Sequence, residues 1–457
     1  MRFSVVGLGK LGASMAAAIA DRGHEVVGVD VDPRAVDAVN AGRAPVDETG
    51  LTERIEANRE RLRATLDHGE AVRESELTFV VVPTPSDDRG AFSLQYAAEA
   101  FREIGRGLRT KDGYHNVVLT STVLPGSTRY GLRPILERES GRRCGAELGL
   151  CYSPEFIALG SVIRDFLNPD FTLVGEWDER AGEQLEAAYA RIVENGAPCR
   201  RMSIENAELT KVALNTYVTM KVTYANMLAE ICERLPGGDV DAVTDALGLD
   251  ERIGRKYLTG ALGYGGPCFP RDNVAFAFMA DAVGAGAPLA ETTDRANRES
   301  SDSLAGRVVS MIPEDATVAV LGLAYKPDTP VIDESPGVAL ARALVRAGVR
   351  VVAYDPLAGE NARVELGDSV VVLDALDACL ERADAVVVTT PDAAFRTLTR
   401  SDLERRGGEV LVVDFWRILP AEVACSPQVR YVPIGRSVDD AANGERLAAL
   451  WDGAGAE

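Results

Sequence analysis

The segment that most constrains this chain is its beginning, where a short apolar run leads directly into a glycine pattern. Residues 2–7 have the apolar character of a strand and lead into GxGxxG, whose glycines are Gly7, Gly9 and Gly12. An alanine-rich helical pattern follows at 13–20, and a second strand pattern at 25–29 ends at Asp30. A glycine pattern between a strand and a helix, with an acidic residue 18 positions past its last glycine, is typical of a Rossmann dinucleotide-binding unit.

In such a unit the glycines let a pyrophosphate approach the N-terminus of the helix. The carboxylate of Asp30 would accept hydrogen bonds from the adenosine ribose and would repel a 2′-phosphate. The pattern therefore predicts NAD rather than NADP as the cofactor. The alternative is a glycine-rich turn in a flavodoxin-like sheet.

The second half of the chain repeats the order of the first half. VAVLGL corresponds to SVVGLG, VVAYDP to VVGVD and AVVVTTP to FVVVPTP. The strand patterns of the second half lie at 317–322, 350–355, 385–390 and 409–414. This internal duplication predicts an α/β fold with two Rossmann-like, doubly wound domains. Because the second copy has no GxGxxG, we expect it to bind something other than a dinucleotide.

A long helical pattern at 203–235 separates the two copies. Its apolar residues lie on more than one side, which is typical of a helix buried against domains or against a partner chain. We therefore expect a homodimer or a higher homo-oligomer, with this central helix joining the two Rossmann-like domains. Lys211 and Asn215 lie four positions apart, so both project from one face of the helix. The predicted domains are 1–202, 203–312 and 313–457.

The segment 263–272 reads GYGGPCFPRD. Its three glycines and two prolines exclude a helix or a central strand and predict a shaped loop. Cys268 follows the glycine pair, and Asp272 lies four positions further on. A cysteine near a base is a candidate nucleophile, and the alternative is a buried, inert cysteine in an ordinary glycine loop.

The composition excludes several classes of function. The formal net charge is −21, so the chain has no basic surface for nucleic acid or an anionic membrane. The seven cysteines are scattered without a CxxC pair, which argues against a metal site and a disulfide framework. No apolar run reaches the ~18 residues of a membrane span. The N-terminal strand pattern leaves no room for a signal peptide, so we expect a cytoplasmic protein.

Several segments together resemble the nucleotide-sugar dehydrogenases of the UDP-glucose/GDP-mannose dehydrogenase family. GYGGPCFPRD resembles the catalytic-cysteine loop GYGGSCFPKD, and NAELTKVALNTY matches the helix with the family's catalytic lysine and asparagine. Further matches are PTP at 83–85, STVLPGS at 121–127, SPEFIALG at 153–160, GLDERIG at 248–254 and GLAYKPDT, for the family's nucleotide-binding GLAFKPxT, at 322–329. The resemblance extends from residue 1 to about 440 and is strongest toward the UDP-glucose 6-dehydrogenases.

The resemblance implies three sets of site residues. The catalytic set is Cys268, Lys211, Asn215, Asp272, Glu155 and Thr122. The cofactor would contact Gly7, Gly9, Leu11, Gly12, Asp30, Arg34, Thr84, Thr122 and Arg271. The sugar nucleotide would contact Glu155, Phe156, Lys211, Asn215, Arg252, Tyr257, Gly265, Phe269, Lys326 and Arg417. In the family, Lys326 would lie on the phosphates, and Arg252 would reach the sugar of a neighbouring subunit.

The implied reaction is an NAD-dependent, four-electron oxidation of a sugar C6 alcohol to a carboxylate, with UDP-glucose as substrate and UDP-glucuronate as product. Cys268 would hold the aldehyde as a thiohemiacetal and then as a thioester. Lys211 and Asn215 would stabilise the oxyanion. Water ordered by Asp272 and Glu155 would hydrolyse the thioester.

Departures from the family pattern bear on the substrate. Leu159 replaces a glutamate, and Asp333 stands where an arginine that contacts NAD is expected. The segment 414–417 reads DFWR where UDP-glucose enzymes have DGRN, so Arg417 would take over the lost arginine one position away. Phe269 favours UDP-glucose over GDP-mannose enzymes, in which leucine is common after the cysteine.

Other functions stay open at this point. The alternative substrate is a UDP-N-acetylhexosamine, such as UDP-GlcNAc or UDP-ManNAc. A β-hydroxyacid dehydrogenase shares a similar N-terminal half but has neither the Cys268 loop nor a second α/β domain. A non-catalytic NAD-binding module is supported only by Leu159 and Asp333, and the complete catalytic set opposes it.

The charged residues also indicate the working conditions. The 49 basic residues include only six lysines. An acidic, arginine-rich surface favours a high-salt cytoplasm, and the alternative is an acidic protein of a GC-rich bacterium. Repulsion between the negative charges is screened once the Debye length is short, about 3 Å at 1 M salt.

We therefore expect thermal unfolding to shift to higher temperature as the KCl concentration rises from ~0.1 to ~3 M. The measurement is the melting temperature, followed by circular dichroism. A melting temperature that stays level or falls would contradict the high-salt interpretation.

Overall fold

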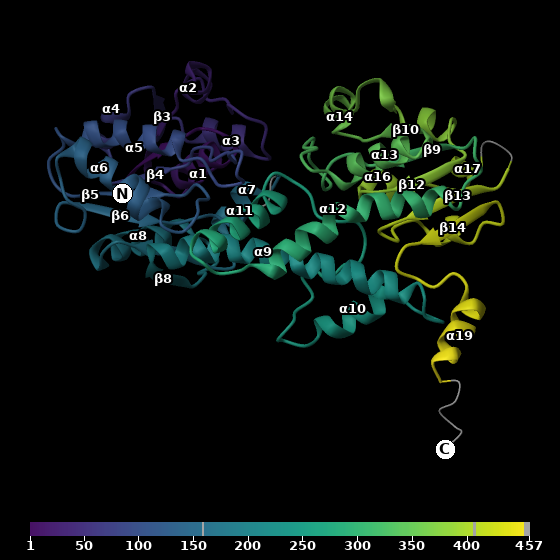
Figure 1. Cartoon of the computed structure of the whole chain (residues 1–457). Helices are drawn as coiled ribbons and strands as arrows, with labels where there is room; N and C mark the ends of the chain where they lie inside the picture. The colour runs from purple at the N-terminus through teal and green to yellow at the C-terminus, as the bar shows by residue number, and fades with distance from the viewer. Residues whose placement is uncertain (158–159, 405–407, 452–457) are drawn as a thin grey trace. The chain divides into compact units, whose positions relative to one another are not determined.

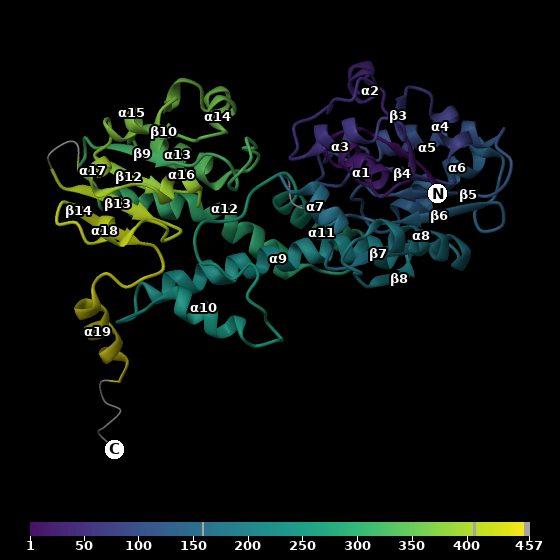
Figure 2. The same cartoon turned by 180° about the vertical axis from the view of Figure 1, so that it is seen from behind.

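The computed structural model describes residues 1–157, 160–404 and 408–451, and Leu159 lies outside them. The chain divides into two compact units (Figures 1 and 2), Met1–Leu214 with Phe278–Ala285, and Asn215–Ala277 with Gly286–Glu457. Each unit contains one sheet of mainly parallel strands, and the long helix α9, Ile204–Cys232, runs from the first unit into the second. The predicted α/β fold with two Rossmann-like domains and a central helix is confirmed. The domain limits at 202 and 312 stay predictions.

The sheet of the first unit has eight strands in the order β3-β2-β1-β4-β5-β6-β7-β8. All neighbours are parallel except β6 and β7. The order of its first six strands is that of dinucleotide-binding sheets. The strands are β1 Arg2–Val6, β2 Glu25–Val29, β3 Leu62–Thr65, β4 Leu77–Val80, β5 His115–Leu119, β6 Leu148–Tyr152, β7 Thr172–Glu176 and β8 Cys199–Ser203.

Helices cover both faces of this sheet (Figure 1). Strand β1 shows why: Phe3 and Val5 join the apolar core that contains α1, whereas Val6 joins the core that contains α5. A strand buried on both faces needs such a continuous apolar run. The helices are α1 Lys10–Asp21, α2 Pro33–Asn40, α3 Leu51–Ala57, α4 His68–Glu74, α5 Gln95–Leu108, the π-helix η1 Ser127–Leu132, α6 Arg133–Ser140, α7 Val162–Leu167 and α8 Glu179–Ile192.

The sheet of the second unit has six parallel strands in the order β11-β10-β9-β12-β13-β14. The first six strands of the first sheet have the same order, so the duplication seen in the sequence extends to the topology. These strands are β9 Thr317–Leu321, β10 Arg350–Tyr354, β11 Val371–Val372, β12 Ala385–Val388, β13 Val410–Asp414 and β14 Val429–Pro433.

The remaining helices lie after α9 in the chain, and α11 ends in the first unit. Their bounds are α10 Val240–Gly248, α11 Phe269–Ala282, α12 Pro288–Val309, α13 Pro336–Arg346, α14 Gly359–Leu366, α15 Leu376–Leu380, α16 Ala393–Arg396, α17 Arg400–Leu403, α18 Ala421–Ala424 and α19 Asp440–Ala448. Among the described residues, none of the helices has the length and apolar character to cross a membrane.

The duplication also reaches the glycines between the first strand and first helix of each sheet. Gly7 has φ +96°, and a Cβ on Gly12 would lie 1.8 Å from the Gly7 oxygen. In the second sheet Gly322 has φ +109°, and a Cβ on Gly337 would lie 2.3 Å from the Gly322 oxygen. The paired glycines are five positions apart in the first copy and fifteen in the second. The second copy therefore keeps the close packing of helix on strand but has a longer loop, which hid this match in the sequence.

Two helical patterns of the sequence are interrupted in the structure. The pattern over 241–258 predicts one helix, but α10 ends at Gly248, because the chain turns back there: a Cβ on Gly248 would lie 2.9 Å from the Cα of Arg255. The pattern after the cysteine loop predicts a helical stretch to about 309, but it forms two helices, α11 and α12, which are separated near Gly284 with φ +74°.

The loop predicted over 263–272 is shorter than expected. Helix α11 already begins at Phe269, directly after Cys268. Pro270 is compatible with this because a proline in the first turn gives up an N–H that would have no partner within the helix.

We expect Gly12→Ala to destabilise the fold, since its new methyl group must displace the carbonyl of Gly7. Overpacking of this kind costs about 1–3 kcal/mol, or a fall in melting temperature of roughly 2–12 °C. Gly9→Ala is the matched control, because a Cβ there has no neighbour within 4 Å. An equal loss of melting temperature in the two variants would contradict the packing role of Gly12.

Candidate active site

The glycine loop at the start of α1 has the geometry of an anion site. Gly9 is the N-cap residue of α1, and no side chain caps the helix, so its first N–H groups face outward. The space beside Gly9 is open, whereas a Cβ on Gly7 would lie 2.1 Å from the Val81 oxygen. Gly7 and Gly12 thus fix the backbone, and Gly9 leaves room for a ligand at the helix N-terminus. This arrangement fits the pyrophosphate of NAD.

Asp30 holds the glycine loop from the end of β2. Its Oδ2 accepts a hydrogen bond from the Leu8 N–H at 2.6 Å, and its Oδ1 accepts one from the Asp32 N–H at 2.9 Å. Each carboxylate oxygen can accept a second bond, so Asp30 retains acceptor capacity for a ribose hydroxyl.

Asp355 is the equivalent residue of the second copy, and its carboxylate is fully engaged. It accepts hydrogen bonds from four backbone N–H groups, those of Leu323, Ala324, Leu357 and Ala358. The second copy therefore lacks the spare acceptor of Asp30, in agreement with the expectation that it does not bind a dinucleotide.

The other predicted cofactor residues of the first unit lie near this loop or at the ends of strands. The Thr84 hydroxyl donates to the Thr122 carbonyl at 2.7 Å, which ties together the loops after β4 and β5. Leu11 is half-buried and packs on the core around α1. The guanidinium of Arg34 is exposed and pairs with Asp32 at 2.8 Å.

Lys211 lies in a small cluster with the segment after β6. Its Nζ donates to the Glu155 carbonyl oxygen at 2.7 Å and lies 4.8 Å from the centre of the Phe156 ring. Burial raises the pKa of the Glu155 carboxyl to about 8, against the opposing effect of the Lys211 charge. The Tyr189 hydroxyl donates to this carboxyl at 3.4 Å. Glu155 can therefore exchange a proton near neutral pH, as a general acid or base requires.

A second cluster surrounds the start of α11. Asn215, one turn after Lys211 on α9, donates from Nδ2 to Asp272 Oδ2 at 2.6 Å. The other oxygen of Asp272 accepts from Arg271 at 3.4 Å, and the Asp272 side chain is 1% exposed. The Asp272 N–H donates to the Cys268 carbonyl at 2.8 Å, within the first turn of the helix.

Cys268 itself is exposed at the N-terminus of α11, whereas Cys151, Cys232 and Cys379 are buried. The N-terminal end of a helix favours negative charge, including that of a thiolate. The position and exposure of Cys268 thus argue against the alternative of a buried, inert cysteine in an ordinary glycine loop.

Aromatic side chains surround the cysteine loop. The ring centres of Tyr257 and Tyr264 each lie 6.4 Å from that of Phe269. Tyr257 has φ +66°, a strained conformation for a residue that is not glycine. A Cβ on Gly265 would lie 2.2 Å from the Glu334 oxygen. The loop is therefore packed tightly and leaves no freedom to substitute this glycine.

Two asparagines that the sequence analysis did not identify hold this loop. Asn297 of α12 bonds both the N–H and the carbonyl of Tyr264, at 2.9 Å each. Asn273 donates to the Tyr264 hydroxyl at 2.9 Å and to the Thr219 hydroxyl at 3.0 Å. In the sequence, each of these residues is only a polar amide within a helical pattern, and such an amide does not indicate a particular function.

Glu208 was also missed. Its side chain is 0% exposed, and its carboxyl accepts hydrogen bonds from the Gly126 N–H at 2.6 Å and the Thr128 N–H at 2.9 Å. Burial raises its pKa to about 7. It joins the loop after Thr122 to α9, one turn before Lys211. A glutamate three positions before the predicted catalytic lysine, inside a mostly apolar helix, was the available signal.

Two predicted substrate residues have other partners. The guanidinium of Arg417 is 2% exposed and binds both oxygens of Asp241, each at 2.8 Å. It also donates to the carbonyls of Gly260, Phe415 and Ile434. This arrangement does not favour the substrate contact predicted for Arg417, because its donors already have acceptors in the protein. Arg252 is largely exposed and pairs with Asp250 at 2.5 Å.

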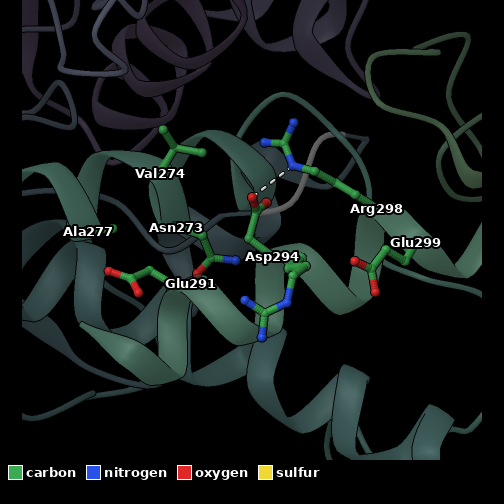
Figure 3. A pocket seen from close by; sticks show the side chains of 8 residues that line it. Asn273, Val274, Ala277, Glu291, Asp294, Arg298 and Glu299 are labelled. Atoms are coloured by element: carbon green, nitrogen blue, oxygen red, sulfur yellow. Dashed lines mark hydrogen bonds and ion pairs between the residues drawn. The ribbon is translucent and has the colours of Figure 1, made fainter. Parts of the chain in front are cut away.

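A pocket of about 400 Å³ lies between α11 and α12 (Figure 3), and its lining contains none of the predicted catalytic residues. Asp294 and Arg298 form an ion pair of 2.8 Å there, and Asn273 contributes to the wall. Among the described residues, no group of three or more His, Cys, Asp or Glu side chains is arranged to hold a metal ion.

Comparison with known proteins identifies the family. Residues 1–193 match the NAD binding domain of the UDP-glucose/GDP-mannose dehydrogenase family, residues 205–299 its central domain and residues 319–421 its UDP binding domain.

Individual relatives match this chain over almost its whole length. The chain is 38% identical to the UDP-glucose 6-dehydrogenase AglM of Haloferax volcanii, over 92% of this chain and 97% of the relative. It is 35% identical to a GDP-mannose 6-dehydrogenase of Pseudomonas putida, over 87% and 93%. The structure of a UDP-glucose dehydrogenase from Pyrobaculum islandicum superimposes with a TM-score of 0.84 at 34% identity, over 95% and 98% of the two chains. The chain therefore belongs to the UDP-glucose/GDP-mannose dehydrogenase family and is an NAD-dependent nucleotide-sugar dehydrogenase.

Proposed function

We propose that this enzyme oxidises the C6 alcohol of UDP-glucose in two steps to the carboxylate of UDP-glucuronate. The observation that carries the proposal is the set of groups at the start of α11. An exposed Cys268 precedes the helix, and the buried Asp272 in its first turn is held by Asn215. An exposed thiol next to a fixed carboxylate supports covalent catalysis.

Cys268 is the nucleophile of the second oxidation. Its sulfur attacks the carbon of the intermediate aldehyde, a C–S bond forms, and the carbonyl electron pair moves to oxygen to give a thiohemiacetal. The glycine loop around Gly9 would hold NAD, which would supply the hydride acceptor for both oxidations. Lys211 and Asn215, one turn apart on α9, are the donors for the oxyanion, a contribution of roughly 10²–10³ in rate per donor.

Acidic side chains provide the proton transfers. Asp272 accepts hydrogen bonds from Asn215 and Arg271, which keeps its carboxylate oriented in the first turn of α11. With Glu155, whose pKa is raised to about 8, it orders the water that attacks the thioester carbon. The C–S bond then breaks, and the sulfur of Cys268 leaves with the electron pair while the sugar carboxylate forms.

The substrate assignment rests on similarity and on Phe269. The UDP-glucose 6-dehydrogenase of Haloferax volcanii and the UDP-glucose dehydrogenase of Pyrobaculum islandicum are 38% and 34% identical to this chain. A UDP binding domain match over residues 319–421 supports a uridine nucleotide. GDP-mannose is the second candidate, because a GDP-mannose 6-dehydrogenase is 35% identical. For a UDP-N-acetylhexosamine, a solved UDP-ManNAc dehydrogenase at 24% identity supports the shared fold alone.

We also infer that the enzyme is a homodimer in which Arg252 reaches the partner's sugar site. Helix α9 exposes a row of large apolar side chains at helical spacing, namely Tyr217, Tyr224, Met227 and Ile231. Such a row on a long helix is typical of a surface that packs on another helix. Arg252 has an exposed side chain, which is compatible with a contact outside its own chain.

We expect Cys268→Ala to separate the two oxidations. The first needs only the cofactor, a base and Lys211, whereas the second needs the tetrahedral adduct that the thiol provides. The variant should bind NAD and UDP-glucose but form no more than one NADH per sugar, and that only when the aldehyde is trapped. The measurement is NADH formed per sugar consumed, with mass spectrometry of the product, for UDP-glucose, GDP-mannose, UDP-GlcNAc and UDP-ManNAc at high KCl concentration.

The control variant is Cys425→Ala, which removes the other exposed cysteine and should leave two NADH per sugar. If Cys268→Ala also makes two NADH and the uronic acid at a near-normal rate, Cys268 is a structural residue. If the wild-type enzyme oxidises GDP-mannose faster than UDP-glucose, GDP-mannose replaces UDP-glucose as the assigned substrate.

We expect Asp30→Gly to relax the preference for NAD over NADP, because the carboxylate that repels a 2′-phosphate is lost. The ratio of kcat/KM for the two cofactors measures this, and the melting temperature of the variant measures separately the loss of the hydrogen bonds from Leu8 and Asp32. An equal loss with both cofactors, at an unchanged ratio, would show that Asp30 acts only on the loop.

A further inference from the structure

The buried carboxyl of Glu208 lies beside a helix that lacks its usual cap. The π-helix η1 is followed directly by α6, and the N-cap residue of η1 is Gly126. A glycine has no side chain that could accept a hydrogen bond from the first N–H groups of a helix. These N–H groups therefore need an acceptor from another part of the fold.

Glu208 supplies this acceptor from α9. Its Oε2 accepts a hydrogen bond from the Gly126 N–H at 2.6 Å, and its Oε1 accepts one from the Thr128 N–H at 2.9 Å. Thr128 is the second residue of η1, a position whose N–H a capping side chain usually binds. The N-terminal end of a helix also favours a negative charge. A carboxylate 80 positions from Thr128 thus takes the part of an N-cap aspartate.

The capped helix end is also the rear anchor of the loop that contains Thr122. At the front of this loop, the Ser121 hydroxyl accepts from the Val82 N–H at 2.9 Å and donates to the Val82 carbonyl at 2.6 Å. The Thr84 hydroxyl donates to the Thr122 carbonyl at 2.7 Å. Thr122 therefore lies between two anchors, and the rear one stands on α9 three positions before Lys211. All of these residues belong to the first compact unit.

The charge state of Glu208 determines the strength of the rear anchor. In the ionised form both oxygens are strong acceptors, whereas protonation turns one oxygen into a hydroxyl and deprives one N–H group of its charged acceptor. Burial raises the pKa of Glu208 to about 7, the charge of Glu205 acts in the same direction, and the hydrogen bonds from η1 oppose both. Arg129 of η1 also faces this carboxyl but binds Glu205, and Lys211 donates to the Glu155 carbonyl.

We propose that Glu208 is a positioning residue: its ionised carboxyl holds the Thr122 loop in place beside the helix that carries Lys211, and protonation of this carboxyl releases the loop. The inference rests on the proposed function, because Thr122 and Lys211 are residues of that site. Glu208 acts through the backbone of the loop and not on a reacting atom. The alternative is a buried acid that only stabilises the fold.

Glu208→Gln tests this inference, because it keeps the shape of the side chain and removes the charge. The amide oxygen can accept one of the two N–H groups, but the NH2 group then faces the other. The matched control is Glu205→Gln, which removes the neighbouring carboxylate of α9 and its contact with Arg129.

The first measurement is hydrogen–deuterium exchange of residues 121–132 in the free enzyme between pH 6 and 8, corrected for the intrinsic effect of pH. If protonation weakens the anchor about tenfold, wild-type protection should fall roughly fivefold from pH 8 to pH 6, with a midpoint near 7. Glu208→Gln should have low protection at both pH values, and Glu205→Gln should keep the pH dependence of the wild type.

Two results would overturn the proposal. One is wild-type protection that does not change with pH, a result that stands even where Glu208→Gln does not fold. The other is an equal loss of protection in β5 and in residues 121–132 of Glu208→Gln, because a residue that only stabilises the fold would loosen both.

Activity gives the second measurement, as the ratio of kcat/KM for NAD between the wild type and Glu208→Gln. Glu155 also titrates in this range, but it does so in both enzymes, so the ratio removes its contribution. With the same tenfold effect, we expect a ratio of roughly nine at pH 8 and roughly two at pH 6, where most wild-type carboxyls are protonated. A ratio that is equal at the two pH values would contradict the proposal.

The exchange experiment needs neither cofactor nor sugar nucleotide, so it can fail while the oxidation tested with Cys268→Ala stands. If UDP-glucose is not oxidised, the proposed substrate is wrong, and the ratio of kcat/KM is measured with the sugar nucleotide that the enzyme does oxidise.

Discussion

Each Rossmann-like half of the molecule depends on one close contact between a helix and the end of a strand. The backbone of Gly12 lies directly on the carbonyl of Gly7, and Gly337 lies in the same way on Gly322. This contact brings the N-terminus of the first helix to the carboxyl ends of the strands, where ligands bind in open α/β sheets. A carboxylate at the end of the second strand then holds the loop, through Asp30 in one half and Asp355 in the other. Both halves share this glycine contact and this carboxylate, and they differ in the length of the loop between the two glycines. The short loop leaves a space beside Gly9, and the long loop brings Tyr325, Asp333 and Glu334 to the cysteine segment.

The sequence predicted the parts of the fold in which local pattern and tertiary burial agree. Strands such as β1 and β9 are buried on both faces, so their apolar runs are visible without a structure. Strand β8, with the sequence CRRMS, is only partly buried, and it was not recognised as a strand. The glycine pair of the second copy was missed because fifteen positions separate its members.

For the site, sequence motifs located residues but not their partners. The pairing of Asn215 with Asp272 joins positions 57 apart, and that of Arg417 with Asp241 joins positions 176 apart. Spacing cannot reveal such contacts, and for this reason Arg417 was assigned to the substrate when its donors are used within the protein. Glu208 and Asn297 were overlooked for the same reason, because their function consists entirely of contacts with distant backbone.

Burial of Glu155 and Glu208 has a thermodynamic cost. Their pKa values are raised from 4.5 to about 8 and about 7, so the folded state retains protons that the unfolded state releases as pH rises through this range. The stability contributed by protonation is thus present in acid and is lost toward neutral pH.

Two of the three crossings between the two compact units fall inside helices, and the third, after Ala285, lies between α11 and α12. The first crossing, after Leu214, lies within α9 between Lys211 and Asn215, and the second, after Ala277, lies within α11 nine positions past Cys268. A chain divided at either of these two points would interrupt a helix that carries predicted catalytic side chains. The nucleotide-binding sheet is different, because residues 310–316 connect α12 to β9 without interrupting a helix. Gene fusion in evolution or in the laboratory could therefore exchange the sheet that begins at Thr317 and leave α9 and α11 continuous. The second sheet could then change in the nucleotide that it accepts, while the helices with the predicted catalytic residues are inherited together.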